Sequence, residues 1–149
     1  LQQQKLHPIL SSKISIYDIL VCMANTKTIK AYFSNDRKYF ENSLGSEYNY
    51  TQATGPYEYL LGALAGCYAS TLSSYERDFN WEELEIEIIA TKRETIPTTL
   101  ENTMLKIKAM GVEDRDGFIL LAKRACDECS IYQTISKVSN MDLDIIFEG

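Results

Sequence analysis

The chain has 149 residues, of which 45% are hydrophobic and 24% charged, a balance typical of a folded globular protein. Its 15 basic and 21 acidic side chains give a net charge of −6, which disfavours binding to a nucleic-acid backbone. The longest apolar run (57–72) is too short to span a bilayer, and no signal-peptide pattern opens the chain, so we expect a cytoplasmic protein without membrane contact.

Segments rich in β-forming residues open the chain after residues 1–15, which we interpret as an N-terminal extension. The predicted strands are Ile16–Met23, Thr28–Ser34 and Lys38–Phe40, with a hairpin turn at Asn35–Arg37. The polar stretch Gly45–Gly55 is predicted to be a loop.

Two helices and three further strands are predicted after this loop. They are a helix over Pro56–Phe79, strands over Leu84–Lys92 and Thr103–Ala109, a helix over Asp114–Lys137 and a strand over Met141–Phe147. The first helix contains small residues that are costly or neutral in helix propensity, and they make sense where another helix approaches closely: Gly62, Ala63, Gly66 and Ala69. Runs of strands separated by single helices favour an α+β fold with antiparallel sheet, in one domain over 1–149.

Two of the four cysteines lie on apolar stripes of the predicted helices. The stripes, each spaced four, three and four, are Leu60, Leu64, Cys67, Thr71 and Phe118, Ala122, Ala125, Cys129. This spacing places both thiols on the inward faces of their helices. If the two helices pack together, the thiols can meet in a mostly apolar pocket.

A CxxC redox motif and a zinc site are less favoured by the sequence than a pair formed by Cys67 and Cys129. Cys126 and Cys129 form a CxxC motif, but it is predicted in mid-helix, and the acidic residues between the thiols raise the pKa of a thiolate. A zinc site lacks a second pair of ligands, and His7 is the only histidine. We therefore interpret Cys126 as a bystander and disfavour a thioredoxin-like reaction through this motif.

Glu58 is the carboxylate nearest to Cys67 on the same predicted helix. It precedes Cys67 by nine positions, which on a straight helix is half a turn out of phase and roughly 13 Å along the axis. Three interpretations stay open: the helix begins after Glu58, Glu58 serves the site of a partner subunit, or it stabilises the helix dipole.

Two motifs resemble the OsmC/Ohr family, the osmotically inducible and organic-hydroperoxide-resistance proteins. The stretch GPYEYLLGALAGC, ending at Cys67, looks like the family's P-x-E-L-L-x-A-L-x-x-C helix. Ala125 to Cys129, followed by Ser130-Ile131, is similar to its A-x-x-x-C-P-V/I segment, with Ser130 in place of the usual proline. The resemblance covers roughly Gly55–Phe147.

The resemblance implies an intertwined homodimer with two central helices behind antiparallel sheets. It also implies a thiol-dependent peroxidase for organic or hydrogen peroxides that needs no bound cofactor or metal. Cys67 would become a sulfenic acid, Cys129 would resolve it to a disulfide, and a dithiol or lipoylated protein would reduce that disulfide. Glu58 matches the family's motif glutamate.

One departure from the family concerns the cation beside the thiolate. The family's peroxidase branch uses an arginine from the N-terminal strands, whereas residues 15–55 hold only Arg37, in a predicted turn. Lys27 or Lys30 could replace it as a point charge. This departure keeps a second hypothesis open, a non-catalytic OsmC-like dimer that binds an apolar small molecule between its helices.

Overall fold

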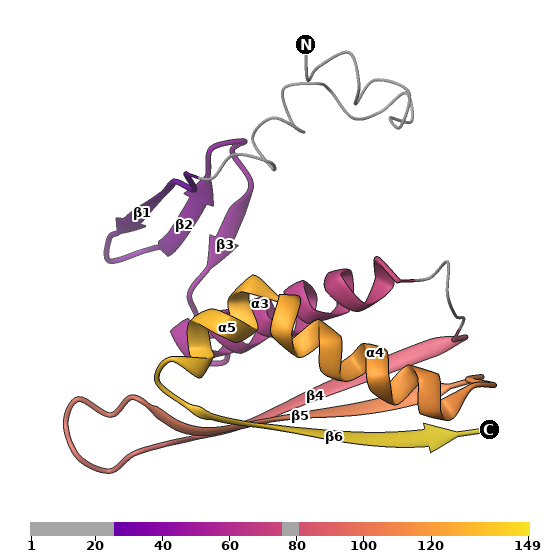
Figure 1. The fold of residues 1–149 in the computed structure, drawn as a ribbon. Coiled ribbons are helices and arrows are strands. Elements are labelled where there is room, and N and C mark those ends of the chain that lie inside the picture. The colour runs from indigo at the N-terminus through magenta and orange to yellow at the C-terminus, as the bar shows by residue number, and fades with distance from the viewer. Residues whose placement is uncertain (1–25, 76–80) are drawn as a thin grey trace, which may run out of the picture. The chain divides into compact units, whose positions relative to one another are not determined.

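The computed structural model describes residues 26–75 and 81–149, which fall into two compact units that meet in the sequence at Pro56/Tyr57. The described elements, in chain order, are β1 (Ile29–Phe33), β2 (Lys38–Asn42), β3 (Glu47–Asn49), α3 (Pro56–Ser73), β4 (Glu83–Lys92), β5 (Leu100–Met110), α4 (Arg115–Glu128), α5 (Ser130–Ser136) and β6 (Asn140–Glu148) (Figure 1). The predicted extension 1–15, the predicted strand Ile16–Met23 and the end of the first predicted helix at 76–79 lie outside the described residues. The expectation of a single domain stays a prediction.

The first unit contains a three-stranded antiparallel sheet in the order β1-β2-β3. The predicted hairpin turn is confirmed, because the Ser34 backbone N–H donates to the Arg37 carbonyl over 2.9 Å. The loop predicted over Gly45–Gly55 is wrong in part, since it contains β3. This short strand pairs with β2, where the rings of Phe40 and Tyr48 stack with centroids 4.9 Å apart.

The second unit contains the sheet β4-β5-β6, and here one sequence prediction is wrong. Strands β4 and β5 pair antiparallel as expected, but β5 and β6 pair parallel. The reason is the connection between them: α4 and α5 carry the chain back along the sheet, so that β6 starts from the same end as β5 (Figure 1). The α+β class itself is confirmed.

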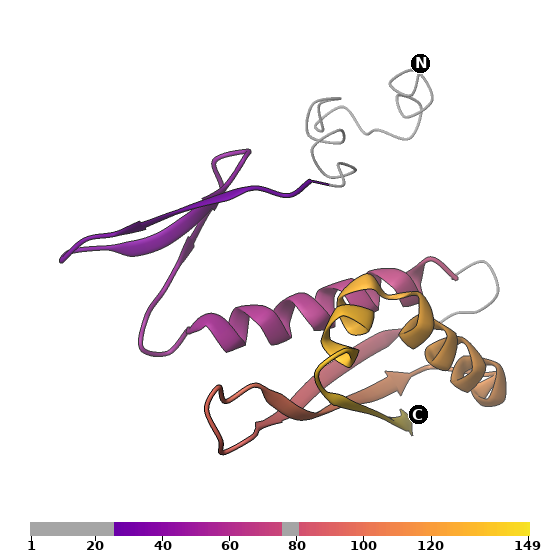
Figure 2. The same ribbon diagram turned by 60° about the vertical axis from the view of Figure 1, so that its left-hand side comes forward.

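Helices α3, α4 and α5 all lie against one face of this second sheet (Figure 2). The alternation along β5 explains this, because Thr103, Leu105, Ile107 and Ala109 are fully buried toward the helices. The opposite face carries charges, and Lys108 forms 3.7 Å ion pairs with Glu85 and Glu148 across the strands. The core thus lies between one sheet face and the three helices.

Helix α3 buries a face slightly different from the predicted stripe. Leu64, Tyr68 and Leu72, spaced by four, are fully buried, while Cys67 beside them is half-buried and Leu60 is 38% exposed.

Within the described ranges, no helix combines the length and the apolar character needed to cross a membrane.

Candidate functional site

The thiols of Cys67 and Cys129 lie in direct contact. Their sulfur atoms are 3.2 Å apart, with the Cys129 thiol donating a hydrogen bond to Cys67 Sγ. A disulfide bond is about 2.05 Å long, so this is a reduced pair in contact. Two residues separated by 62 positions therefore meet, as the two helical stripes predict.

Helix α3 holds Cys67 through its packing against α4. The hydroxyl of Tyr68, next to Cys67 in the chain, is fully buried and donates to the Ala122 carbonyl of α4 over 2.7 Å. Thr71 donates its hydroxyl to the Cys67 carbonyl over 2.9 Å. The first contact fixes α3 against α4, and the second rigidifies the turn that carries the thiol.

Cys129 lies at a break between two helices, where the sequence predicts one continuous helix over Asp114–Lys137. Its backbone is extended (φ −72°, ψ 115°), and it is both the C-cap of α4 and the N-cap of α5. Its sulfur accepts the backbone N–H of Tyr132 over 3.4 Å, as an N-cap side chain does. The Gln133 side chain donates to the Cys126 carbonyl over 2.9 Å, which satisfies a group that the break deprives of its helical partner.

The hydrogen bonds around the pair give the two thiols different acidities. Burial raises the pKa of Cys67, but donation from the Ile131 backbone, the Cys129 thiol, and the side chain and backbone of Ser130 outweighs burial, so the net pKa is lowered. Burial raises the pKa of Cys129, and its bond to Cys67 and the negative charge there raise it further. The anion therefore favours Cys67 and the proton favours Cys129.

Sequence reasoning missed the donors to Cys67 on α5. Ser130 Oγ lies 3.8 Å from Cys67 Sγ, and the Ile131 backbone also donates to this sulfur. The available signal was the serine that follows Cys129 where the family motif has proline. Proline has no N–H and no hydroxyl, so the difference changes what position 130 can donate.

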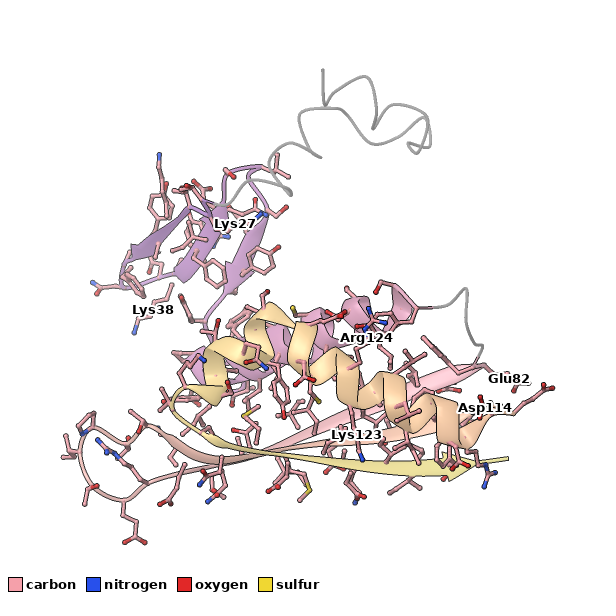
Figure 3. All side chains as sticks on the ribbon, viewed as in Figure 1. Lys27, Lys38, Glu82, Asp114, Lys123 and Arg124 are labelled. Atoms are coloured by element: carbon pink, nitrogen blue, oxygen red, sulfur yellow. The ribbon has the colours of Figure 1, made fainter. Side chains whose placement is uncertain are left out.

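An ion-pair cluster next to Cys129 ties the end of α4 to the end of α3. Tyr75 donates its hydroxyl to Glu128, and Arg124 donates to the other Glu128 oxygen over 2.8 Å while lying 5.0 Å from the centre of the Tyr75 ring. Figure 3 shows Arg124 on α4 close to α3. The Tyr75 hydroxyl and the Arg124 guanidinium lower the pKa of Glu128. The acidic residue beside Cys129 is thus held as a carboxylate in a hydrogen-bonded pair.

Cys126 has a different environment from the thiol pair. It is 8% exposed, and burial raises its pKa, an effect that the neighbouring hydroxyls of Tyr132 and Tyr68 offset only in part. It lines a hollow of about 390 Å³ between α4, α5 and β6, whose lining includes Lys123, which extends from α4 toward β6 in Figure 3. A buried thiol with a raised pKa is a poor nucleophile.

Glu58 is not brought to the thiol pair within this chain. It is exposed in the first turn of α3, which runs unbroken from Pro56 to Ser73. The interpretation that the helix begins after Glu58 is therefore wrong. Nine helical residues still place Glu58 half a turn away from Cys67 and roughly 13 Å along the axis.

The three candidate cations belong to the first unit. Arg37 pairs with Glu47 within that unit and lies 4.0 Å from the centre of the Tyr39 ring. Lys30 lies in β1, in register with Glu41 of β2. Lys27 lies just before β1.

The described residues contain no candidate metal site. Among residues 26–75 and 81–149, no three His, Cys, Asp or Glu side chains gather closely enough to hold a metal ion. What these residues do assemble is a pair of thiols with opposite pKa shifts.

A family model described as OsmC-like protein matches residues 49–144, a range that contains both thiols. The chain belongs to the OsmC family. No curated protein sequence matches it. The OsmC-like fold suggested by the two cysteine motifs is confirmed.

Solved structures of OsmC proteins share this fold at low sequence identity. An OsmC-like protein from Mycoplasma pneumoniae has a TM-score of 0.74 at 13% identity, over 85% of this chain and 100% of its own. An organic hydroperoxide resistance protein from Elizabethkingia anophelis has a TM-score of 0.67 at 13% identity, over 85% of this chain and 99% of its own. One from Legionella pneumophila, also described as a predicted redox protein, has a TM-score of 0.62 at 14% identity, over 81% and 96%.

Proposed function

We propose that this OsmC-family chain is a thiol-dependent peroxidase in which Cys67 attacks the peroxide and Cys129 resolves the product. The observation that carries the proposal is the 3.2 Å contact between their sulfur atoms, together with pKa shifts in opposite directions. The names of the Legionella and Elizabethkingia proteins, organic hydroperoxide resistance proteins, agree with a peroxide as substrate.

The first step consumes the peroxide at Cys67. The thiolate sulfur attacks the terminal oxygen of RO–OH, the O–O bond breaks, and Cys67 becomes a sulfenic acid. The leaving alkoxide takes a proton from solvent and departs as the alcohol. A lowered pKa favours this step because the thiolate, not the thiol, is the nucleophile.

The second step closes a disulfide. Cys129 loses its proton and attacks the Cys67 sulfur, and the sulfenic oxygen leaves as water. The two sulfur atoms need to approach by little more than 1 Å from their 3.2 Å contact to reach bonding distance. The hydrogen bond between Cys129 and Cys67 places the resolving sulfur beside the attacked one before the reaction begins.

The third step returns the pair to its reduced form with an external reductant. A small dithiol, or the lipoyl group of a lipoylated protein, attacks the disulfide and leaves as its own cyclic disulfide. The net reaction converts one peroxide and one dithiol into an alcohol, water and an oxidised dithiol, with no bound cofactor. A reducing compartment such as the cytoplasm supplies such thiols.

A homodimer gives Glu58 a role that one chain does not. Glu58 lies on the far side of α3 from Cys67, so a site that uses both residues needs the Glu58 of the partner subunit. A helix face is available for such a partner, because a Cβ added at Gly62 or Gly66 meets nothing within 4 Å. The close helix contact that these glycines predict is therefore assigned to a second copy of this chain.

The proposal is tested by the consumption of cumene hydroperoxide and hydrogen peroxide in the presence of excess dihydrolipoamide. Cys67→Ser should abolish turnover, whereas Cys129→Ser should leave a single stoichiometric burst followed by slow turnover. Cys126→Ser is the matched control, since Cys126 is buried outside the pair, and it should turn over like the unchanged chain. Undiminished turnover in Cys67→Ser would contradict the proposal, and thiols untouched by peroxide would favour a non-catalytic binding protein.

A further inference from the structure

Ser130 is the residue that immediately follows Cys129, and its side chain lies next to the other cysteine of the pair. Its Oγ is 3.8 Å from Cys67 Sγ, within the range of hydrogen bonds that involve sulfur. Its backbone also donates toward the same sulfur. One residue thus offers Cys67 two donors, one from the side chain and one from the main chain.

The backbone around Ser130 is held by local hydrogen bonds. Ser130 is the first residue of α5, after the extended Cys129. Its carbonyl accepts the Thr134 hydroxyl over 2.8 Å, and the Cys129 carbonyl accepts the Gln133 N–H over 3.0 Å. These bonds fix the position of the Ser130 Cβ. The helix break therefore sets the side from which the Ser130 hydroxyl reaches Cys67.

A hydroxyl at this distance acts differently on the two forms of Cys67. Toward the thiolate it donates a charge-assisted hydrogen bond, which is roughly twice as strong as a bond between neutral groups. Toward the thiol only a weak bond forms, because S–H is a poor donor and sulfur a poor acceptor. The difference favours the thiolate, and it needs no cation beside the sulfur.

Ser130 is also exposed, which distinguishes it from the other donors to Cys67. Cys129 is fully buried and Ile131 is partly buried, whereas Ser130 borders solvent. A peroxide that approaches Cys67 from solvent can therefore meet the hydroxyl of Ser130 beside the sulfur. Donation to Cys67 then takes place at the accessible side of the thiol pair.

We infer that Ser130 is a further catalytic residue of this chain, whose hydroxyl donates to Cys67 Sγ and holds this sulfur as the attacking anion. The inference rests on the proposed function in one respect, that Cys67 is the attacking sulfur. In this chain Ser130 supplies a hydroxyl and a backbone N–H at a position where the family motif has proline, which has neither group.

Two substitutions separate the hydroxyl from the backbone donor. Ser130→Ala removes the hydroxyl and keeps the N–H, while Ser130→Pro removes both. Proline suits the first position of a helix, and the extended backbone of Cys129 (φ −72°, ψ 115°) is what a residue before proline adopts. Ser136→Ala is the matched control, because the Ser136 hydroxyl bonds to the Gln133 carbonyl of the same helix.

The readout is the pH profile of Cys67 alkylation by iodoacetamide on the reduced full chain, resolved by peptide mass spectrometry. Cys129 is the titratable side chain that hydrogen-bonds Cys67, and it is kept in every variant. We expect the midpoint to rise from the unchanged chain to Ser130→Ala and again to Ser130→Pro. A rise of half a unit to one unit slows alkylation near pH 7 by about three- to tenfold for Ser130→Ala.

Peroxide consumption by the same variants should fall with the alkylation rate, while circular dichroism confirms that each is folded. A Ser130→Ala profile that superimposes on those of the unchanged chain and of Ser136→Ala would overturn the inference. A shift in Ser130→Pro alone would also overturn it, because that result assigns the effect to the N–H. If the unchanged chain consumes no hydroperoxide, the proposed function fails, yet the alkylation profiles still test the hydrogen bond from Ser130.

Discussion

Cys129 donates its thiol proton to Cys67 Sγ over 3.2 Å, and its own sulfur accepts the backbone N–H of Tyr132 over 3.4 Å. One side chain is thus the N-cap of α5 and a hydrogen-bond partner of the proposed nucleophile. The break between α4 and α5 makes both roles possible, because an extended residue can turn its side chain to the end of the next helix and still reach α3. A local irregularity of the chain therefore builds the pair of thiols.

The first prediction is that mild oxidation joins Cys67 to Cys129. One equivalent of hydroperoxide added to the reduced chain should give a loss of two mass units and a linked peptide pair that contains these two residues. The 3.2 Å contact favours this disulfide over any that uses Cys126, whose pKa is raised by burial. A disulfide between Cys126 and Cys129, found by peptide mapping in place of the expected one, would refute the assignment of roles.

The second prediction concerns the pH dependence of Cys67. Its pKa is lowered in the folded chain, so its alkylation rate should reach half of its plateau below the ordinary thiol pKa of about 8.5. Cys129→Ala removes a donor to the thiolate and should move this midpoint upward, since the anion loses stabilisation. Unfolding in urea should return the midpoint to the ordinary value in both proteins. A folded midpoint at or above the unfolded one would contradict the prediction.

The lowered pKa also gives a sign for stability. A folded thiol with a lowered pKa contributes stability above its unfolded pKa, and this contribution is lost as the pH falls through the folded pKa. Cys129 has a raised pKa and acts in the opposite sense, so its contribution is lost as the pH rises through its folded value. The two effects oppose each other near the ordinary thiol pKa, and therefore the reactivity of Cys67 is a sharper readout than the free energy of unfolding.

The thiol pair could be predicted from the sequence because it depends on helical periodicity and on two motifs. Cys67 lies on the apolar stripe of the first predicted helix. Cys129 ends the stripe of the second, whose other members, Phe118, Ala122 and Ala125, are buried. The break at Cys129 could not be predicted, because periodicity continues across it. The break is stabilised by the Cys129 thiol, which caps α5, and by the Gln133 side chain, which bonds to the Cys126 carbonyl. Neither hydrogen bond follows from the helical spacing of apolar residues.

The parallel pairing of β5 and β6 could not be predicted from the sequence for a related reason. Both strands show the alternation of a half-buried strand, which is the same for either direction of pairing. Direction is set by where the intervening helices deliver the chain, and a helix of 14 residues with a further seven-residue helix returns it to the starting end. The backbone donors to Cys67 could not be predicted either, since N–H groups leave no mark in the sequence.

The third prediction is a loss of stability on Tyr68→Phe. The Tyr68 hydroxyl is buried and donates to the Ala122 carbonyl over 2.7 Å, so its removal should lower the free energy of unfolding by about 1–2 kcal/mol. The measurement is urea unfolding at one fixed protein concentration. Tyr32→Phe is the control, because its hydroxyl bonds to Glu41 at an exposed position, where a much smaller loss is expected. Equal losses in the two variants would contradict the burial argument.

The fourth prediction tests whether Glu58 acts on the Cys67 of a partner subunit. Glu58→Gln and Cys67→Ser homodimers should each be weakly active or inactive, for different reasons. When the two proteins are unfolded together and refolded, a mixed dimer gains one site with the Cys67 of one chain and the Glu58 of the other.

Random reassembly makes half of the dimers mixed, with one complete site of two in each, so the mixture should recover about a quarter of the unchanged activity. Mixing Glu58→Gln with a Glu58→Gln, Cys67→Ser double variant is the control, because no pairing of those chains completes a site. If the helix dipole were the whole role of Glu58, the Glu58→Gln chain would keep nearly full activity and lose only about 0.3–1 kcal/mol of stability. Recovery in the first mixture and not in the control would assign the carboxylate to the neighbouring subunit's thiol.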